Sequence, residues 1–170
     1  IDNFSLDVFS KVQDVKKSSL TFAPEAGSQR MRNVINKGLT EEDILGGARL
    51  AFESGWNRVK LYFMLGLPTE TDEDIIGIAD LAQRILDLYY SIENRPKGRS
   101  PQISVSCATF VPKPFTPFQF EPQDTRAEIE RKQKLLLDSV KSKKIKVSYH
   151  DPDVSQLEAV LAKGDRRLCD

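Results

Sequence analysis

The sequence predicts an α/β fold in which a parallel sheet is flanked by helices. Short apolar runs that suit strands alternate with longer segments in which apolar residues recur every three or four positions. Hydroxyl and acidic residues that suit helix starts follow several of these runs, and glycine or proline marks the turns. Strands that alternate with helices pair in parallel through right-handed crossovers, so this order predicts one parallel sheet.

The clearest strand-to-helix unit covers residues 59–74. Val59 to Leu65 is rich in β-branched, aromatic and aliphatic residues, which predicts a strand buried on both faces. Gly66 follows as a turn, and the hydroxyl and acidic residues up to Asp74 predict a helix N-terminus. Ligands bind at the carboxyl ends of the strands in parallel sheets. We therefore expect Gly66 to Glu70 to touch any ligand.

The remaining elements are predicted from the same periodicities and from turn residues. Pro24 is expected to end the first strand, and Gly38 is expected to end a helix in a left-handed conformation. Four strands are too few to close an eight-stranded barrel, so the sheet is either open or part of a barrel whose other strands lie outside the sequence. The predicted strands are residues 19–23, 59–65, 103–109 and 145–150. The first predicted helix begins at Ser5. The other predicted helices cover about residues 29–37, 41–54, 72–90, 126–143 and 155–164.

Composition narrows the class of protein. The 25 basic and 25 acidic residues cancel, so bulk charge gives no argument for nucleic acid or a membrane surface. No apolar run approaches the ~20 residues of a membrane span and no leader is recognisable, which predicts a cytoplasmic protein. Cys107 and Cys169 are too far apart for a short-spaced metal motif. The first residue, Ile1, and the arginine pair near the end suggest a piece of a longer protein.

Several side chains have two interpretations. Glu25 at a strand-to-helix turn could bind hydroxyls or an amine of a ligand, or it could interact with the helix dipole. The phenylalanine- and proline-rich segment 111–120 could form a wall over a flat ligand, but we favour a hydrophobic plug over the end of the sheet. His150 with Asp151 and Asp153 could bind a metal, although a strand-end histidine beside a proline is the commoner case.

Three longer strings are more specific than any residue within them. Taken together they resemble the second half of a radical S-adenosylmethionine (SAM) domain, especially uncharacterised radical SAM Fe-S oxidoreductases related to the cobalamin-binding branch. The resemblance covers residues 1–150, and residues 151–170 then form a C-terminal helix and a charged extension. The strings are TFAPEAGSQRMRNVINKG (21–38), KLYFMLGLPTET (60–71) and FVPKPFTPFQ (110–119).

The resemblance implies a fold and a set of SAM-binding residues. The fold would be the second half of a (β/α)6 partial TIM barrel, with strands 19–23, 59–65 and 103–109 as its fourth to sixth strands. Glu25 resembles the polar residue that contacts the SAM ribose or amino group, and Lys37 resembles the basic residue that reaches the SAM carboxylate. Tyr62 stands where many relatives have a ribose-binding aspartate. The residues that would pack near adenine are Met64, Leu65, Gly66 and Val111.

The resemblance also implies what the chain lacks. In such enzymes three cysteines near the first strand bind a 4Fe-4S cluster that reductively cleaves SAM, and this sequence has no such set. We therefore expect a part of a radical SAM oxidoreductase or transferase-like enzyme that is inactive alone, with neither SAM nor cluster bound. The partners implied are the missing N-terminal half, a substrate of unknown class, and a second copy joined through an exposed sheet edge.

Two alternatives remain open from the residues. The chain could be a non-catalytic α/β binding or scaffold module. It could also belong to an ordinary TIM-barrel enzyme that uses Glu25 or Glu70 as an acid or base, which predicts a carboxyl group of raised pKa in a pocket.

Overall fold

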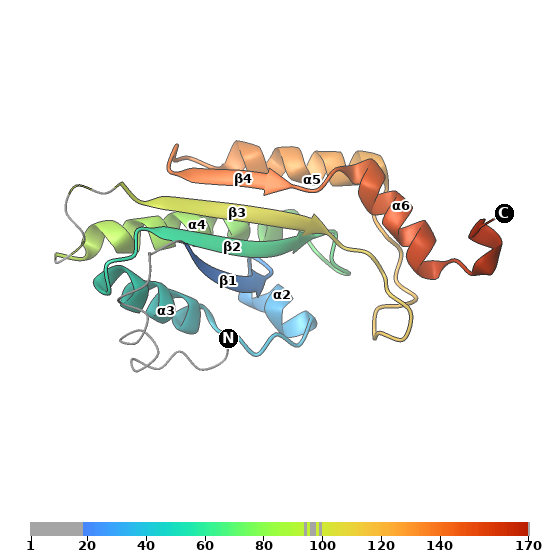
Figure 1. The fold of residues 1–170 in the computed structure, drawn as a ribbon, viewed down its shortest axis with the longest axis horizontal. Helices are drawn as coiled ribbons and strands as arrows, with labels where there is room; N and C mark the ends of the chain where they lie inside the picture. The colour runs from blue at the N-terminus through green and yellow to red at the C-terminus, as the bar shows by residue number, and fades with distance from the viewer. Residues whose placement is uncertain (1–18, 94, 96–97, 99, 170) are drawn as a thin grey trace.

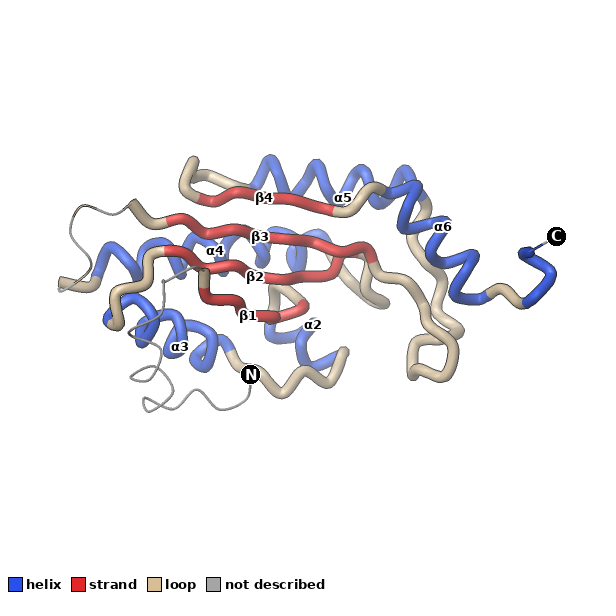
Figure 2. The backbone as a smooth tube through the Cα atoms, viewed as in Figure 1, coloured by secondary structure: helices blue, strands red, loops and turns tan. Residues whose placement is uncertain are grey.

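The structure, a computed structural model, describes residues 19–93, 95, 98 and 100–169. Its centre is a four-stranded sheet in the order β1-β2-β3-β4, in which every neighbouring pair is parallel (Figures 1 and 2). The predicted α/β fold with a parallel sheet and flanking helices is therefore confirmed. The predicted helix that begins at Ser5 lies outside the described residues. The strands are β1 (Leu20–Glu25), β2 (Arg58–Leu65), β3 (Gln102–Thr109) and β4 (Ile145–Tyr149).

Helices cover one face of this sheet. Figure 1 looks onto the other face, with α4 passing behind β2 and β3 and α6 extending beyond the carboxyl ends of the strands. The helices are α2 (Gln29–Val34), α3 (Glu41–Glu53), α4 (Asp72–Ser91), α5 (Arg126–Ser139) and α6 (Pro152–Lys163), followed by a short 3-10 turn, η1 (Arg166–Cys169). Within the described residues, no helix combines the length and the apolarity needed to cross a bilayer.

The two faces of the sheet differ in chemistry, which corrects the expectation that Val59 to Leu65 is buried on both. Alternate residues of β2 are buried, and the residues between them are partly or fully exposed. The helices within the described residues cover one face of the sheet and leave the other uncovered, so burial alternates with a period of two along the strand. We call the uncovered side the open face. It carries Thr21, Arg58, Lys60, Tyr62, Met64, Gln102, Ser104, Ser106, Ala108, Lys146 and Ser148.

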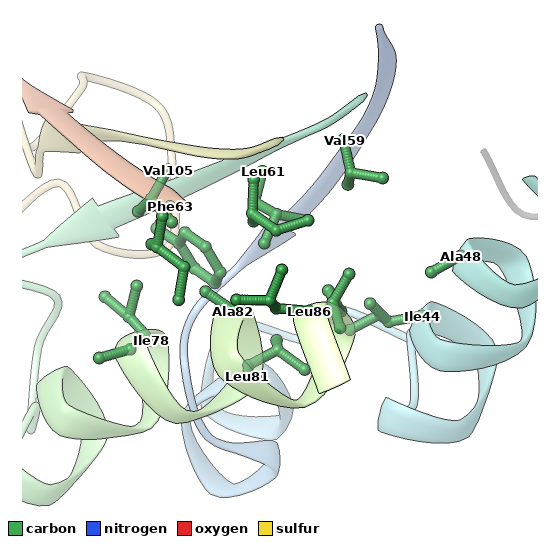
Figure 3. Close-up of a cluster of buried hydrophobic side chains, with 14 of the residues drawn as sticks. Ile44, Ala48, Val59, Leu61, Phe63, Ile78, Leu81, Ala82, Leu86 and Val105 are labelled. Carbon is green, nitrogen blue, oxygen red and sulfur yellow. The ribbon is translucent and has the colours of Figure 1, made fainter. Parts of the chain in front are cut away.

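The main core lies between the sheet and helices α3 and α4. Val59, Leu61, Phe63 and Val105 point from the strands toward apolar side chains of α3 and α4 (Figure 3). The Phe52 and Tyr89 rings, from α3 and α4, meet edge to face with centroids 5.1 Å apart. Burial of such side chains contributes roughly 1.5–3 kcal/mol each, which makes this layer the main source of stability.

Several predicted boundaries were wrong; α5, for example, ends at Ser139 and not near residue 143. β1 continues through Pro24 to Glu25, because an edge strand does not need the N–H that proline lacks. Asn36, with φ 54°, adopts the left-handed conformation expected of Gly38. α6 begins at Pro152 and not at Ser155, since the Asp151 carboxylate caps it by accepting from the backbone N–H groups of Asp153 and Val154.

Residues after β1 pack directly against the first two turns of α4. An added Cβ at Gly27 would lie 2.3 Å from the backbone oxygen of Asp74 and 2.4 Å from the backbone nitrogen of Ile78. Real Cβ atoms do not approach backbone so closely, so only glycine permits this contact. The contact fixes the turn after β1 against the helix that follows β2.

We predict that Gly27→Ala lowers the free energy of unfolding by about 3 kcal/mol, because the methyl group must push two backbones apart. Chemical denaturation measures this change. Gly46→Ala is the matched control: Gly46 lies exposed in α3, and an added Cβ there meets nothing within 4 Å. The control should gain about 0.5–1 kcal/mol from helix propensity. Equal effects of the two substitutions would contradict the packing argument.

Candidate functional site

The segments that follow β1, β2 and β3 converge at the carboxyl end of the sheet. A second apolar cluster joins them: Ala26 after β1, Met31 of α2, Leu67 after β2 and Phe110 after β3 are all buried together. The Phe110 backbone N–H also donates to the Leu65 carbonyl at 2.8 Å. We call these three segments, residues 25–28, 66–71 and 110–112, the rim. Their convergence was the main structural expectation from the sequence.

Glu25, the first residue of the rim, forms an ion pair with Lys37. Glu25 is the last residue of β1, and Lys37 follows α2. The Lys37 Nζ and Glu25 Oε1 atoms are 3.5 Å apart, and the two side chains are 34% and 29% exposed. Glu25 has φ 67°, an uncommon conformation for a residue with a side chain, and a register shift in β1 precedes it. The pair is accessible, and it offers one negative and one positive group to a ligand.

Tyr62 and Met64 lie on the open face of β2 at different depths. Tyr62 is 39% exposed, and the Lys60 Nζ atom is 4.6 Å from the centroid of its ring. Met64 is half-buried and packs against the second apolar cluster. Its neighbour in register on β3 is Ala108, a small side chain. Met64 therefore links the open face to the rim.

The other predicted adenine-packing residues differ in accessibility. The Leu65 side chain belongs to the main core and is 1% exposed, so it faces the helices and not the rim. Gly66 is buried with φ 82°, and its N–H donates to the Glu70 carboxylate at 2.7 Å. Val111 is half-buried next to Phe110. Of these three residues, only Val111 leaves a side chain accessible at the rim.

A buried ion group supports the turn after β2. The Lys132 ammonium of α5 lies 3.1 Å from the Glu70 carboxylate and 2.7 Å from that of Asp124. The Lys132 and Glu70 side chains are 7% and 3% exposed. Asp124 also closes one side of Gly66, where an added Cβ would lie 2.8 Å from an Asp124 carboxylate oxygen. Ion pairs of Lys132 therefore connect α5 to the turn after β2, which is part of the rim.

The same ion group determines the protonation properties of Glu70. Burial raises the pKa of Glu70, although the Gly66 N–H and the Lys132 ammonium act to lower it. The pKa of Lys132 is raised as well: burial opposes its charge, but the two carboxylates outweigh that effect. Glu70 is enclosed and contacts both partners, so its raised pKa is that of a buried carboxyl group that anchors the turn after β2.

A second polar group joins the rim to α4. Asp74 accepts hydrogen bonds from the Ser28 hydroxyl and the Thr71 N–H, and it forms an ion pair with Arg30. Arg30 also donates to the Thr69 carbonyl at 2.9 Å. Burial acts to raise the pKa of Asp74, but these hydrogen bonds lower it overall. Thr69 has φ 66°, which is rare for a β-branched residue and is the kind of strain that clusters at functional sites.

The loop after β3 is only partly the plug that the sequence favoured. Phe110 is buried and Phe118 packs beside it, with ring centroids 6.2 Å apart and nearly perpendicular planes. Phe115 and Phe120 are 98% and 89% exposed. The Lys113 ammonium pairs with Glu158 of α6 at 2.5 Å. Two of the four aromatic rings therefore close the end of the sheet, and two project away from it.

The part of the chain that the structure describes offers little for metal binding. Cys107 is buried in β3, and burial raises the pKa of its thiol to about 12, with the Glu70 charge as a smaller cause. No group of three or more His, Cys, Asp or Glu residues is arranged to hold a metal ion within the described ranges. Asp151 is occupied as the cap of α6, and Asp153 pairs with Arg126 at 2.9 Å.

Sequence reasoning missed both buried polar groups. In the sequence, Lys132 is one of many charged residues of α5, and it lies 62 positions after Glu70. Nothing local marks such a pairing. The open face could have been found, because Ser104 and Ser106 alternate with buried apolar residues in β3, which is the period of a strand with one polar side.

We predict that Lys132→Met lowers the free energy of unfolding by about 3–5 kcal/mol at pH 7, because the Glu70 carboxylate loses its buried counter-charge. The pKa of Glu70 in the folded state is already raised, and it rises further without the ammonium. Stability linked to Glu70 then falls as the pH increases through this range, so the cost of the substitution should be smaller at pH 5 than at pH 7. Denaturation at both pH values measures it.

Two variants control this experiment. Adding Glu70→Gln to Lys132→Met should recover part of the loss, since an uncharged amide needs no counter-ion. Lys134→Met on the exposed side of α5 should change stability by less than about 0.5 kcal/mol. A Lys132→Met effect that is independent of pH and unaffected by Glu70→Gln would refute the ion-group interpretation.

Comparisons with known proteins agree with the resemblance. Residues 2–82 match the sequence profile of the Radical SAM superfamily. The chain is also 36% identical over 154 residues to the uncharacterized protein MJ0966 of Methanocaldococcus jannaschii, an alignment that covers 91% of this chain and 32% of that protein. The chain thus spans about a third of the length of this relative. The segment from residue 2 to residue 82, which ends within α4, is therefore similar to the radical SAM superfamily.

Proposed function

We propose that the rim is the part of a radical SAM active site that binds the methionyl and adenosyl groups of SAM. The observation that carries this proposal is the Glu25–Lys37 pair at the end of β1, next to the convergence of three post-strand segments. The methionyl end of SAM carries an ammonium group and a carboxylate. Glu25 would accept from the ammonium and Lys37 would donate to the carboxylate, so that SAM replaces a contact the two residues make with each other.

The adenosyl group would lie toward β2 and β3 in this proposal. Met64 and Val111 offer half-buried apolar side chains there, and Tyr62 offers a phenol further along the open face. Leu65 and Gly66 would contribute the shape of the backbone, because the Leu65 side chain is in the core and the Gly66 N–H is engaged with Glu70. The match of residues 2–82 to the superfamily and these accessible groups support the assignment.

The residues of this chain do not fit the iron–sulfur cluster that such a reaction uses. A 4Fe-4S cluster is held by closely placed thiolates. The sequence has two cysteines, and one of them, Cys107, is enclosed in the sheet as a neutral thiol. We therefore propose that the cluster ligands come from another part of a longer protein, which would complete the enzyme, and that the chain alone is inactive. The reducing cytoplasm suits such a cluster, and we propose it as the location.

Reconstitution of the 170-residue chain tests its inactivity. After anaerobic treatment with iron and sulfide, optical and EPR spectra should lack a cysteine-bound 4Fe-4S signal, and calorimetry should show weak or undetectable SAM binding. A stable cluster signal from this chain would contradict the proposed division of the site.

The Glu25–Lys37 assignment is tested in the complete, cluster-containing protein. Glu25→Gln and Lys37→Met should each weaken SAM binding about tenfold or more, because each removes a charge-assisted hydrogen bond of roughly 1.5–3 kcal/mol. Equilibrium binding of SAM measures this change. The exposed residues Glu73 and Lys134 give matched controls, Glu73→Gln and Lys134→Met, which should bind SAM normally. Equal affinity in all four variants would refute the roles of Glu25 and Lys37.

We also propose that copies of this chain associate through the outer edge of β1. Among the described strands, β1 pairs only with β2, which leaves its other side free of strand partners. Unpaired edges tend to add a strand from another chain. Light scattering should then show a dimer or larger species at high micromolar concentration, and a clean monomer would contradict the proposal.

A further inference from the structure

We propose that the amino-terminal end of the sheet binds the phosphate groups of a small, multiply charged anion. A cavity of about 600 Å³ lies there, at the opposite end of the strands from the rim. Its lining comes from the starts of β2, β3 and β4 and from the residues just before them. The lining residues are Asn57, Arg58, Ser100, Pro101, Gln102, Lys143, Lys144 and Lys146.

Half of this lining is cationic. Arg58, Lys143, Lys144 and Lys146 contribute four positive charges, and none of the described lining residues is acidic. Among the described residues, no carboxylate forms an ion pair with any of these four side chains, whereas several other lysines and arginines do form such pairs. The whole chain is neutral, so this concentration of charge is local. Such a site attracts anions.

Strand register brings the basic residues to one side. Arg58 of β2 is in register with Gln102 of β3, and Lys60 is in register with Ser104 and, through it, with Lys146 of β4. Arg58, Gln102 and Lys146 therefore point to the open face. Neighbouring strands are about 4.8 Å apart, so β2 and β4 are separated by roughly 10 Å. A di- or triphosphate group can span this separation.

Neutral polar groups complete the lining. The Lys144 Nζ atom donates to the Ser100 hydroxyl at 2.6 Å, and the Asn57 amide donates to the Ser100 carbonyl at 2.9 Å. These contacts tie the residues before β2, β3 and β4 together. The guanidinium of Arg58 can bind a phosphate group with two parallel hydrogen bonds, and the lysines act as point charges around it.

The size of the cavity favours a small molecule over a nucleic acid strand. Its volume lies within the range of about 300–1,000 Å³ typical of small-molecule sites. β2 is eight residues long, so roughly 26 Å separate this end of the sheet from the rim. The phosphate site is therefore a second site, and its test does not depend on SAM binding at the rim.

Titration of the 170-residue chain with inorganic tripolyphosphate tests the proposal. Calorimetry at low ionic strength should show saturable binding of one tripolyphosphate, and Arg58→Gln and Lys146→Gln should each weaken binding about fivefold. Lys134→Gln, an exposed lysine of α5, is the matched control and should leave the affinity unchanged. Raising the salt concentration should weaken binding in the unsubstituted chain more than in either site variant.

Side-chain amide NMR signals locate the site independently of the variants. Tripolyphosphate should shift the signals of Asn57 and Gln102 and leave the Gln83 amide on α4 unchanged. Absence of saturable binding would overturn the proposal, as would equal weakening by Lys134→Gln. Binding of a single-stranded RNA oligonucleotide more tightly than tripolyphosphate, with the same residues involved, would also overturn it in favour of a nucleic-acid surface.

Discussion

The close approach of Gly27 to α4 is the contact on which the candidate site depends. It presses the turn after β1 against the helix that follows β2, with only backbone between them. Ser28 and Arg30 then reach Asp74, and Arg30 reaches the Thr69 carbonyl. These contacts join residues that are 39 to 46 positions apart in the chain into one continuous surface. Glu25 projects from that surface in a fixed, strained conformation.

Division of the sheet into two faces separates stability from binding. The covered face contributes apolar burial, and it contains the Leu65 and Cys107 side chains. The open face carries serines, lysines and a tyrosine, which can bind a ligand through hydrogen bonds and charge. Its two ends differ as well. The rim combines a carboxylate with an ammonium, whereas the cavity at the opposite end is lined by cations and, among the residues that the structure describes, by no acidic side chain.

Local patterns in the sequence predicted the elements and their order, because periodicity, caps and turn residues act over a few positions. The helix predicted over about 41–54 forms as α3, with a capping box of Thr40 and Asp43 at its start and Gly55, with φ 89°, just after its end. The end of β1 at Glu25 was missed, because an edge position tolerates Pro24 and edge positions cannot be read locally. The contact between Lys132 and Glu70 was missed for the same reason, because local patterns do not show which distant residues meet. The resemblance gave Glu25 and Lys37 separate contacts with SAM, and the ion pair between them is a result of the fold.

Lys132 shows that a helix on the covered side of the sheet helps to fix the shape of the rim. It extends from α5, on the covered side of the sheet, to a turn on which a ligand would rest. A ligand at the rim would never meet α5, yet any movement of that helix would draw the Glu70 turn with it. Substitutions in the outer helices could therefore change the specificity of the rim during evolution, although these helices do not contact the bound molecule.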